Sequence, residues 1–106
     1  MPFKINITTI KPEGSTALWP FESDRPDLNQ DKTNEHEVWA SQQPGFIDRT
    51  SSWITPGFVY EKIYIFDTRE NAEAFLEARK TEETHSARRQ YFNENGFVST
   101  KTIWEI

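Results

Sequence analysis

The sequence predicts an α+β domain whose elements follow one another as strand, helix, strand, strand, helix and strand. Three observations lead to this fold class. Apolar and polar residues alternate from Phe3 onward, residues 43–78 form an unbroken strand, turn, strand and helix pattern, and a last β-rich stretch follows Asn95-Gly96. Each predicted element has its own pattern in the chain.

The first strand is predicted over Phe3 to Ile10, because its first half alternates between apolar and polar residues. From Lys11 to Leu28 the chain carries three prolines and, at its centre, the apolar run Leu18 to Phe21. Connections of this length are usually lids, binding loops or disordered segments. Its Trp and Phe rings argue against disorder. Two interpretations stay open, a lid over a cleft or static packing against the domain.

The first helix is predicted over Lys32 to Gln42, with Asp31 or Thr33 as its N-cap. Residues at helical spacing that share one face are Glu35, Val38, Trp39 and Gln42. Pro44 and Gly45 follow, and we expect Gly45 to adopt a positive φ that turns the chain into the next strand.

Two strands are predicted over residues 46–54 and 58–66, joined by the turn Thr55 to Gly57. One face of the second strand carries Phe58, Tyr60, Lys62, Tyr64 and Phe66, and the other carries Val59, Glu61, Ile63 and Ile65. A strand that is apolar on both faces must be covered on both. In so short a chain the helices cover one face, so we expect a second copy of the protein to cover the other and predict a homodimer.

A second helix is predicted after Asp67, which forms a capping-box pattern with Glu70. Its apolar stripe would comprise Ala72, Phe75, Leu76, Arg79, Glu83 and Ala87. Because two members of this stripe are charged, we predict a kink or a departure from the sheet near Lys80. Tyr91 and Phe92 would then bring the end of the helix back to the domain.

The last strand is predicted over residues 97–106. This order of elements forms a four-stranded antiparallel sheet with both helices on one face, which is the ferredoxin-like arrangement. We expect residues 1–106 to form a single domain of this kind.

The composition excludes several classes of function. The net charge is −5 and no concentrated basic face is visible, so nucleic acid and anionic membrane are unfavourable partners. The chain has no cysteine, which excludes disulfides and thiolate catalysis. No secretion signal and no membrane-spanning run is apparent, and we expect a cytoplasmic protein. Segment 27–31 resembles a calcium loop but lacks its glycine and its final glutamate, so we expect no metal. We also expect no cofactor.

Two segments resemble the antibiotic biosynthesis monooxygenase family of dimeric α/β barrels. They are Gln43 to Ile47 after the first helix, and Tyr64 to Ala72 leading into Phe75. The resemblance implies a homodimer whose two sheets face one another, with a small-ligand cleft in each protomer between sheet and helices. Heme-degrading relatives use an Asn on the first strand, where this chain has Asn6, and a Trp where it has Phe66. Their helical His would correspond to His85, which helical spacing places away from the sheet.

The leading hypothesis is a protein that encloses an elongated, largely apolar small molecule of fatty-acid type in this cleft. The predicted ligand-binding residues are Trp19, Phe21, Trp39, Arg49, Tyr60, Lys62, Tyr64, Phe66, Phe75 and Leu76. Lys62 or Arg49 would hold an acidic end by charge-assisted hydrogen bonds, and a Tyr hydroxyl would orient a carbonyl.

Two alternatives stay open. The first is a cofactor-free monooxygenase or related enzyme acting on an aromatic substrate, with Asn6, Tyr64 and His36 as candidate catalytic residues. The second is a structural or interaction module whose aromatic residues all belong to the core. For His36, between two glutamates, and for His85, in a charged helix, the pattern favours solvent-exposed positions.

Overall fold

The computed structural model describes residues 1–106 except for the side chain of Thr84. Its main elements are β1 (Phe3–Ile10), α1 (Gln30–Ser41), β2 (Phe46–Thr55), β3 (Val59–Phe66), α2 (Arg69–Arg79), α3 (Glu83–Glu94) and β4 (Val98–Glu105). A short 3-10 turn, η1, spans Pro20–Glu22. The four strands form one antiparallel sheet in the order β2-β3-β1-β4. The predicted ferredoxin-like fold is confirmed.

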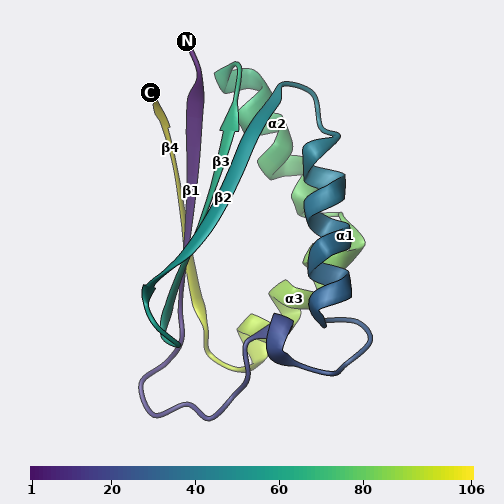
Figure 1. Ribbon diagram of the computed structural model, residues 1–106, viewed down its shortest axis with the longest axis vertical. Helices are drawn as coiled ribbons and strands as arrows, with labels where there is room; N and C mark the ends of the chain where they lie inside the picture. Colours follow the sequence, from purple (N-terminus) through teal and green to yellow (C-terminus); the bar gives the residue numbers. More distant parts are fainter.

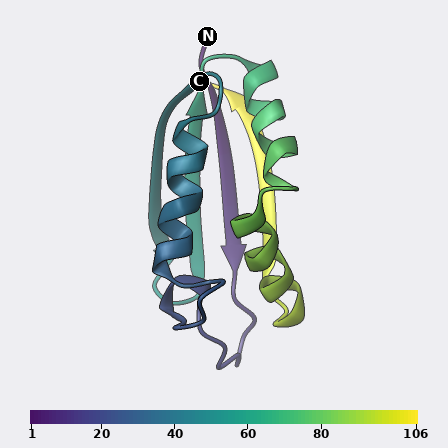
Figure 2. The ribbon, with the colours of Figure 1, turned by 90° about the vertical axis from the view of Figure 1, so that its right-hand side faces the viewer.

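All helices lie on one face of the sheet, and the opposite face is left uncovered in this single chain (Figure 1). In the perpendicular view, α1 lies over the β2 and β3 side, whereas α2 and α3 lie over the β4 side (Figure 2). The long segment after β1 returns beneath the helices, so that η1 lies near α3 at one end of the sheet (Figure 1). No helix in the described part of the chain is long and apolar enough to cross a membrane.

Strand register determines which side chains meet on the helix-covered face. Ile5 pairs with Tyr64 of β3, and Ile7 pairs with Lys62 on one side and with Lys101 of β4 on the other. Because side chains alternate between the two faces of a strand, residues paired in this way point to the same side. The centre of the helix-covered face therefore holds one isoleucine flanked by two lysines.

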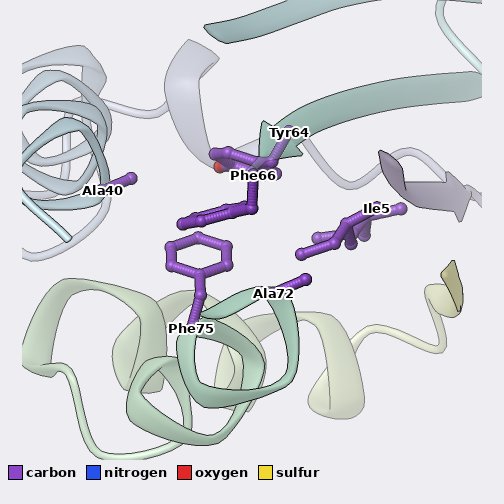
Figure 3. Packing of buried hydrophobic residues seen from close by; sticks show 7 residues of the cluster. Ile5, Ala40, Tyr64, Phe66, Ala72 and Phe75 are labelled. Carbon is purple, nitrogen blue, oxygen red and sulfur yellow. The ribbon is translucent and has the colours of Figure 1, made fainter. Parts of the chain in front are cut away.

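The hydrophobic core occupies the end of the sheet beneath α2. Its buried members are Ile5, Ile7, Ala40, Tyr64, Phe66, Ala72 and Phe75. The ring of Phe75 on α2 lies 4.9 Å from Phe66 and 4.8 Å from Tyr64, measured between centroids. Figure 3 shows Phe66 and Phe75 facing each other, with Ile5 and Ala72 beside them. The rings that the sequence placed on this face of β3 thus hold α2 against the sheet.

Both predicted helix caps are wrong by one or more residues. The N-cap of α1 is Asn29, whose side chain accepts from Lys32 N, and that of α2 is Thr68, whose side chain accepts from Asn71 N. Asp67 instead accepts a hydrogen bond from the Asn71 amide. Asn, Asp, Ser and Thr are all good N-caps, so a run of such residues does not identify the one that is used.

The buried face of α1 also differs from the prediction. The buried residues are Thr33, His36 and Ala40, whereas Val38 is 57% exposed. Few residues of this helix are apolar, so hydrophobic spacing hardly constrains which way the helix turns.

The predicted kink near Lys80 is confirmed as a complete break. α2 ends at Arg79 and α3 begins at Glu83, so residues beyond the break do not continue the face of α2. The prediction for His85 assumed one continuous helix through this point, and its placement away from the sheet is wrong. His85 instead faces the sheet side, where it contacts Arg79.

Gly45 has the predicted positive φ, at 81°. A Cβ atom built there would lie 2.9 Å from Asn71 Cβ and closer still to polar atoms of Asp67 and Asn71. The turn between α1 and β2 therefore needs glycine for two reasons, backbone conformation and close approach to the start of α2.

We expect Gly45→Ala to lower the free energy of unfolding by at least about 1 kcal/mol more than Gly14→Ala does. Gly14 has a similar φ of 77°, but a Cβ atom added there would meet none of the described atoms within 4 Å. The control variant Gly14→Ala therefore introduces backbone strain without a steric clash. Urea unfolding of the three proteins measures both losses. Equal losses would show that the contact with Asn71 is unimportant.

Candidate functional site

A cavity of about 230 Å³ lies between the sheet, α3 and the segment around η1. It begins where the hydrophobic core ends, next to Ile7. One part of its wall is aromatic, with the rings of Trp19, Phe21, Tyr60, Phe92 and Phe97. Another part is basic. Ligand sites of folded proteins have this character, an apolar hollow with a few convergent polar groups.

Trp19 anchors the aromatic part. Its side chain is 2% exposed, its ring lies 5.0 Å from that of Phe97 and 5.1 Å from that of Trp53, and its Nε1 donates to Gly57 O at 2.8 Å. Tyr91 on α3 donates its hydroxyl to Leu18 O. These contacts hold the segment on both sides and favour static packing over a lid. Trp19 is nevertheless part of the cavity wall.

The basic part contains five Lys and Arg side chains, namely Lys62, Arg79, Arg88, Arg89 and Lys101. They come from β3, α2, α3 and β4. Among the described residues that line the cavity, none is Asp or Glu. The whole chain has 17 acidic and 12 basic residues, so the sign of the charge at the cavity is opposite to that of the protein.

Arg79 and Arg88 are buried although they are charged, with 4% and 5% of their surface exposed. Arg79 Nη2 lies 3.3 Å from His85 Nδ1, and its guanidinium lies over the Phe75 ring. Within the described part of the chain, Arg79 Nε, Arg79 Nη1 and Arg88 Nη2 have no hydrogen-bond acceptor. Burial lowers the pKa of both groups, but guanidinium groups remain charged in proteins.

Lys62 and Arg49, which the sequence singled out for an acidic ligand end, are both paired with Glu37 on α1. Lys62 Nζ lies 3.1 Å from Glu37 Oε1, and Arg49 Nε contacts the other carboxylate oxygen. The Tyr64 hydroxyl donates to the same carboxylate at 3.2 Å. Burial, with Arg88 adding to it, lowers the pKa of Lys62 to about 7, and burial raises the pKa of Tyr64 to about 12. The single Glu37 carboxylate therefore offsets only part of the charge of these two cations.

The two histidines form a stacked pair, with ring centroids 5.7 Å apart. Glu82 Oε2 accepts from His36 Nδ1 at 2.9 Å and from the His85 backbone N at 2.8 Å. His36 is fully buried, so the expectation of solvent-exposed positions was wrong. Burial and the nearby guanidinium groups lower the pKa of both imidazoles, that of His85 to about 2. Both rings are therefore neutral at pH 7.

The predicted ligand-binding residues separate into two groups. Trp19, Phe21, Tyr60 and Lys62 line the cavity. The remaining predicted side chains, Trp39, Tyr64, Phe66, Phe75 and Leu76, belong to the hydrophobic core or pack against it, and Arg49 pairs with Glu37. Asn6 lies on the other face of the sheet, where its amide donates to Glu61.

Sequence reasoning missed Arg88, His85 and Lys101 as cavity residues. Arg79 had a detectable signal, because it stands in the apolar stripe of its helix. The positions of Arg88 and His85 depend on the direction of α3 after the break, and no local pattern in the chain specifies that direction.

We expect the free energy of unfolding to fall as the pH drops below about 6.5, the pKa of an unperturbed histidine. There the unfolded chain protonates both imidazoles, whereas the folded chain keeps them neutral because their pKa values are lowered. Each histidine contributes a loss of up to about 1.4 kcal/mol per pH unit. Urea unfolding at a series of pH values measures the slope.

The variant His85→Gln removes one of the two groups and should show a smaller slope than the wild type. An identical slope in both proteins would contradict the buried neutral state of His85.

No protein-family model and no curated protein matches the chain. Solved structures do match its fold. SnoaB from Streptomyces nogalater, a cofactor-independent oxygenase, aligns with a TM-score of 0.58 at 14% identity over 99% of this chain and 91% of its own. A candidate antibiotic biosynthesis monooxygenase from Nitrosomonas europaea aligns with a TM-score of 0.60 at 11% identity over 98% of this chain and 89% of its own.

An EthD family protein from Bacillus halodurans aligns with a TM-score of 0.56 at 19% identity over 100% of this chain and 99% of its own. At identities this low, the similarity demonstrates a common fold but does not extend to the chemistry of the proteins. The chain thus has the ferredoxin-like fold of the antibiotic biosynthesis monooxygenase structures, as the resemblance of residues 43–78 predicted.

Proposed function

We propose that this protein binds a small organic molecule in the cavity between the sheet, α3 and η1. The observation that carries the proposal is the combination of an aromatic wall with buried donors that lack an acceptor within the described chain. Buried donors normally have partners. A ligand with acceptor atoms and an apolar body would give these donors partners and fill the aromatic part of the cavity.

The size of the cavity and the rings of its wall support a compact ligand. Its volume of about 230 Å³ is slightly below the range usual for drug-sized ligands. The rings of Phe21 and Tyr60 lie 5.4 Å apart, and those of Phe92 and Phe97 lie 5.0 Å apart. A flat aromatic body of one or two rings suits such walls better than a long flexible chain, because it loses less conformational entropy when it is ordered.

A homodimer is part of the proposal, with the uncovered faces of the two sheets in contact. This face carries Ile63 and Ile65, which are partly buried, and Trp104, which is 45% exposed. No helix or strand in the described part of the monomer covers this side (Figure 1). Lys4 pairs with both Ile65 and Trp104, so these apolar side chains alternate with polar ones across the strands. Large apolar side chains gathered on one uncovered face commonly mark an interface.

A cofactor-free oxygenase is the second candidate function. Its support is the similarity in fold to SnoaB, a cofactor-independent oxygenase, together with a basic cavity that would stabilise a deprotonated aromatic substrate. Of the three candidate catalytic residues, Asn6 lies on the opposite face of the sheet, Tyr64 is hydrogen-bonded to Glu37 and His36 to Glu82. Oxygen consumption in the presence of quinols separates turnover from binding alone.

We expect Ser99→Phe to weaken the binding of 2-naphthoate by at least about tenfold, or about 1.4 kcal/mol. Ser99 lines the cavity, so a phenyl ring there occupies the space of the ligand. Isothermal titration calorimetry measures the affinity. Gln90→Phe places the same ring at an exposed position of α3 outside the cavity and should bind like the wild type. Equal affinity in all three proteins would place the ligand elsewhere.

We expect the wild type to sediment as a dimer at micromolar concentration and Ile63→Asp to be monomeric or insoluble. A carboxylate buried in the proposed interface at position 63 loses its hydration without gaining a cationic partner. Val38→Asp, at a position of α1 that is 57% exposed, should remain dimeric. Analytical ultracentrifugation of the three proteins tests this, and a monomeric wild type would refute it.

A further inference from the structure

We propose that the ligand of this cavity is an organic carboxylate, whose acid group accepts hydrogen bonds from Arg79 and Arg88 while its aromatic body lies among the rings. The inference rests on the proposed function, because it assumes that the cavity binds a ligand. It names the chemical class of that ligand and the two residues that select it.

The two guanidinium groups are buried without full compensation. Both side chains are more than nine-tenths buried. Three of their nitrogen atoms, Arg79 Nε and Nη1 and Arg88 Nη2, have no acceptor among the described residues. A buried charge without a partner is strongly unfavourable. An anion that enters from solvent would remove this cost, so its binding is favoured by an interaction that the empty protein does not make.

The other positive groups near the cavity already have a carboxylate partner or lie at its edge. Lys62 and Arg49 share the Glu37 carboxylate. Lys101 and Arg89 are exposed to solvent, where screening weakens their attraction for a ligand. The two buried arginines therefore determine where the acid group lies.

The two arginines reach the cavity from different helices. Arg79 is the last residue of α2, and Arg88 lies about one and a half turns into α3, beyond the break. Both line the same cavity because the helix changes direction between them. Guanidinium groups that arrive from two helices can surround one carboxylate, and Arg is suited to this because its donors lie in a rigid plane.

The neighbouring histidines do not compete for the role. Burial, Arg79 and Arg88 lower the pKa of His85 to about 2, so this ring is neutral at physiological pH. Arg79 Nη2 lies beside His85 Nδ1 at 3.3 Å. The neutral imidazole accepts this one donor and leaves the other nitrogen donors of Arg79 available to a ligand.

The aromatic part of the cavity wall favours a planar, aromatic body for the rest of the ligand. It includes Phe21, Tyr60 and Phe92, whose rings favour contact with a planar aromatic group. A bare inorganic anion would leave this apolar part unfilled. A carboxylate attached to one or two aromatic rings would fill it and meet the guanidinium groups at the same time.

The test compares 2-naphthoate with its neutral analogue 2-naphthalenemethanol and with inorganic phosphate, by isothermal titration calorimetry at neutral pH. We expect the wild type to bind the acid at least about tenfold more tightly than the alcohol, and phosphate more weakly than either. Arg79→Gln and Arg88→Gln should each weaken the binding of the acid by about tenfold or more. The affinity for the alcohol should change by less than about threefold. Arg25→Gln, at an exposed arginine paired with Asp27, is the matched control and should bind like the wild type.

Thermal unfolding of the ligand-free variants gives an independent readout. Because Arg88 is buried without full compensation, Arg88→Gln should melt at the same temperature as the wild type or higher. A lower Tm combined with unchanged affinity for 2-naphthoate would show that Arg88 is structural and would overturn the inference.

The outcomes distinguish the two proposals. If the acid and the alcohol bind equally, the cavity is a ligand site but the carboxylate inference fails. If phosphate binds as tightly as 2-naphthoate and with the same dependence on Arg88, the site takes a bare anion and the aromatic carboxylate is refuted. If neither naphthalene compound binds, the proposed function fails and the inference with it.

Discussion

The ring of Phe75 lies within 5 Å of the rings of Tyr64 and Phe66 and attaches α2 to the central part of the sheet. This contact comes from a few large aromatic side chains, in a protein with only 35% hydrophobic residues. Each such ring buries about 150–250 Å², so the cluster can hold one end of the domain without many aliphatic residues. The other end of the sheet is left for the cavity.

The break after Arg79 lies just beyond this attachment. Aromatic contacts hold α2 against the sheet as far as its last residue, Arg79. This residue is charged although it stands in the buried stripe of the helix. Beyond the break, α3 is held through contacts with the segment around Trp19, including the Phe92 ring and the Tyr91 hydroxyl. The two attachments leave an unfilled volume between them, and this volume is the cavity.

The buried charges around the cavity are unfavourable for stability. A cavity filled by aliphatic side chains would avoid the desolvation of two guanidinium groups and two imidazoles. Proteins break local rules of burial at functional sites more often than elsewhere. The concentration of cations in one cavity of an acidic protein is a departure of this kind, and it supports the proposal of ligand binding in a fold that hosts many unrelated functions.

Much of the fold could be predicted from sequence because its patterns are local, whereas the site could be predicted only in part. Alternation along β1 and the glycine at position 45 each report on a strand or turn and its immediate surroundings. Three rings of the cavity wall, Trp19, Phe21 and Tyr60, and the inward-facing Lys62 were also identified, whereas Phe92 and Phe97 were not. Arg88 and His85 were not, and His36 was placed in solvent, since α1 and α3 are too polar for hydrophobic spacing to orient them.

The sequence by itself therefore determined the order of the elements, the fold and the aromatic character of one sheet face. Only the tertiary structure decided which cations are paired and which are not. Glu37 and Lys62 are 25 residues apart, and the neutral His36 ring lies 46 residues from Glu82, its hydrogen-bond partner. Whether a charge is compensated depends on distances between atoms from such distant segments, and these distances exist only once the chain has folded.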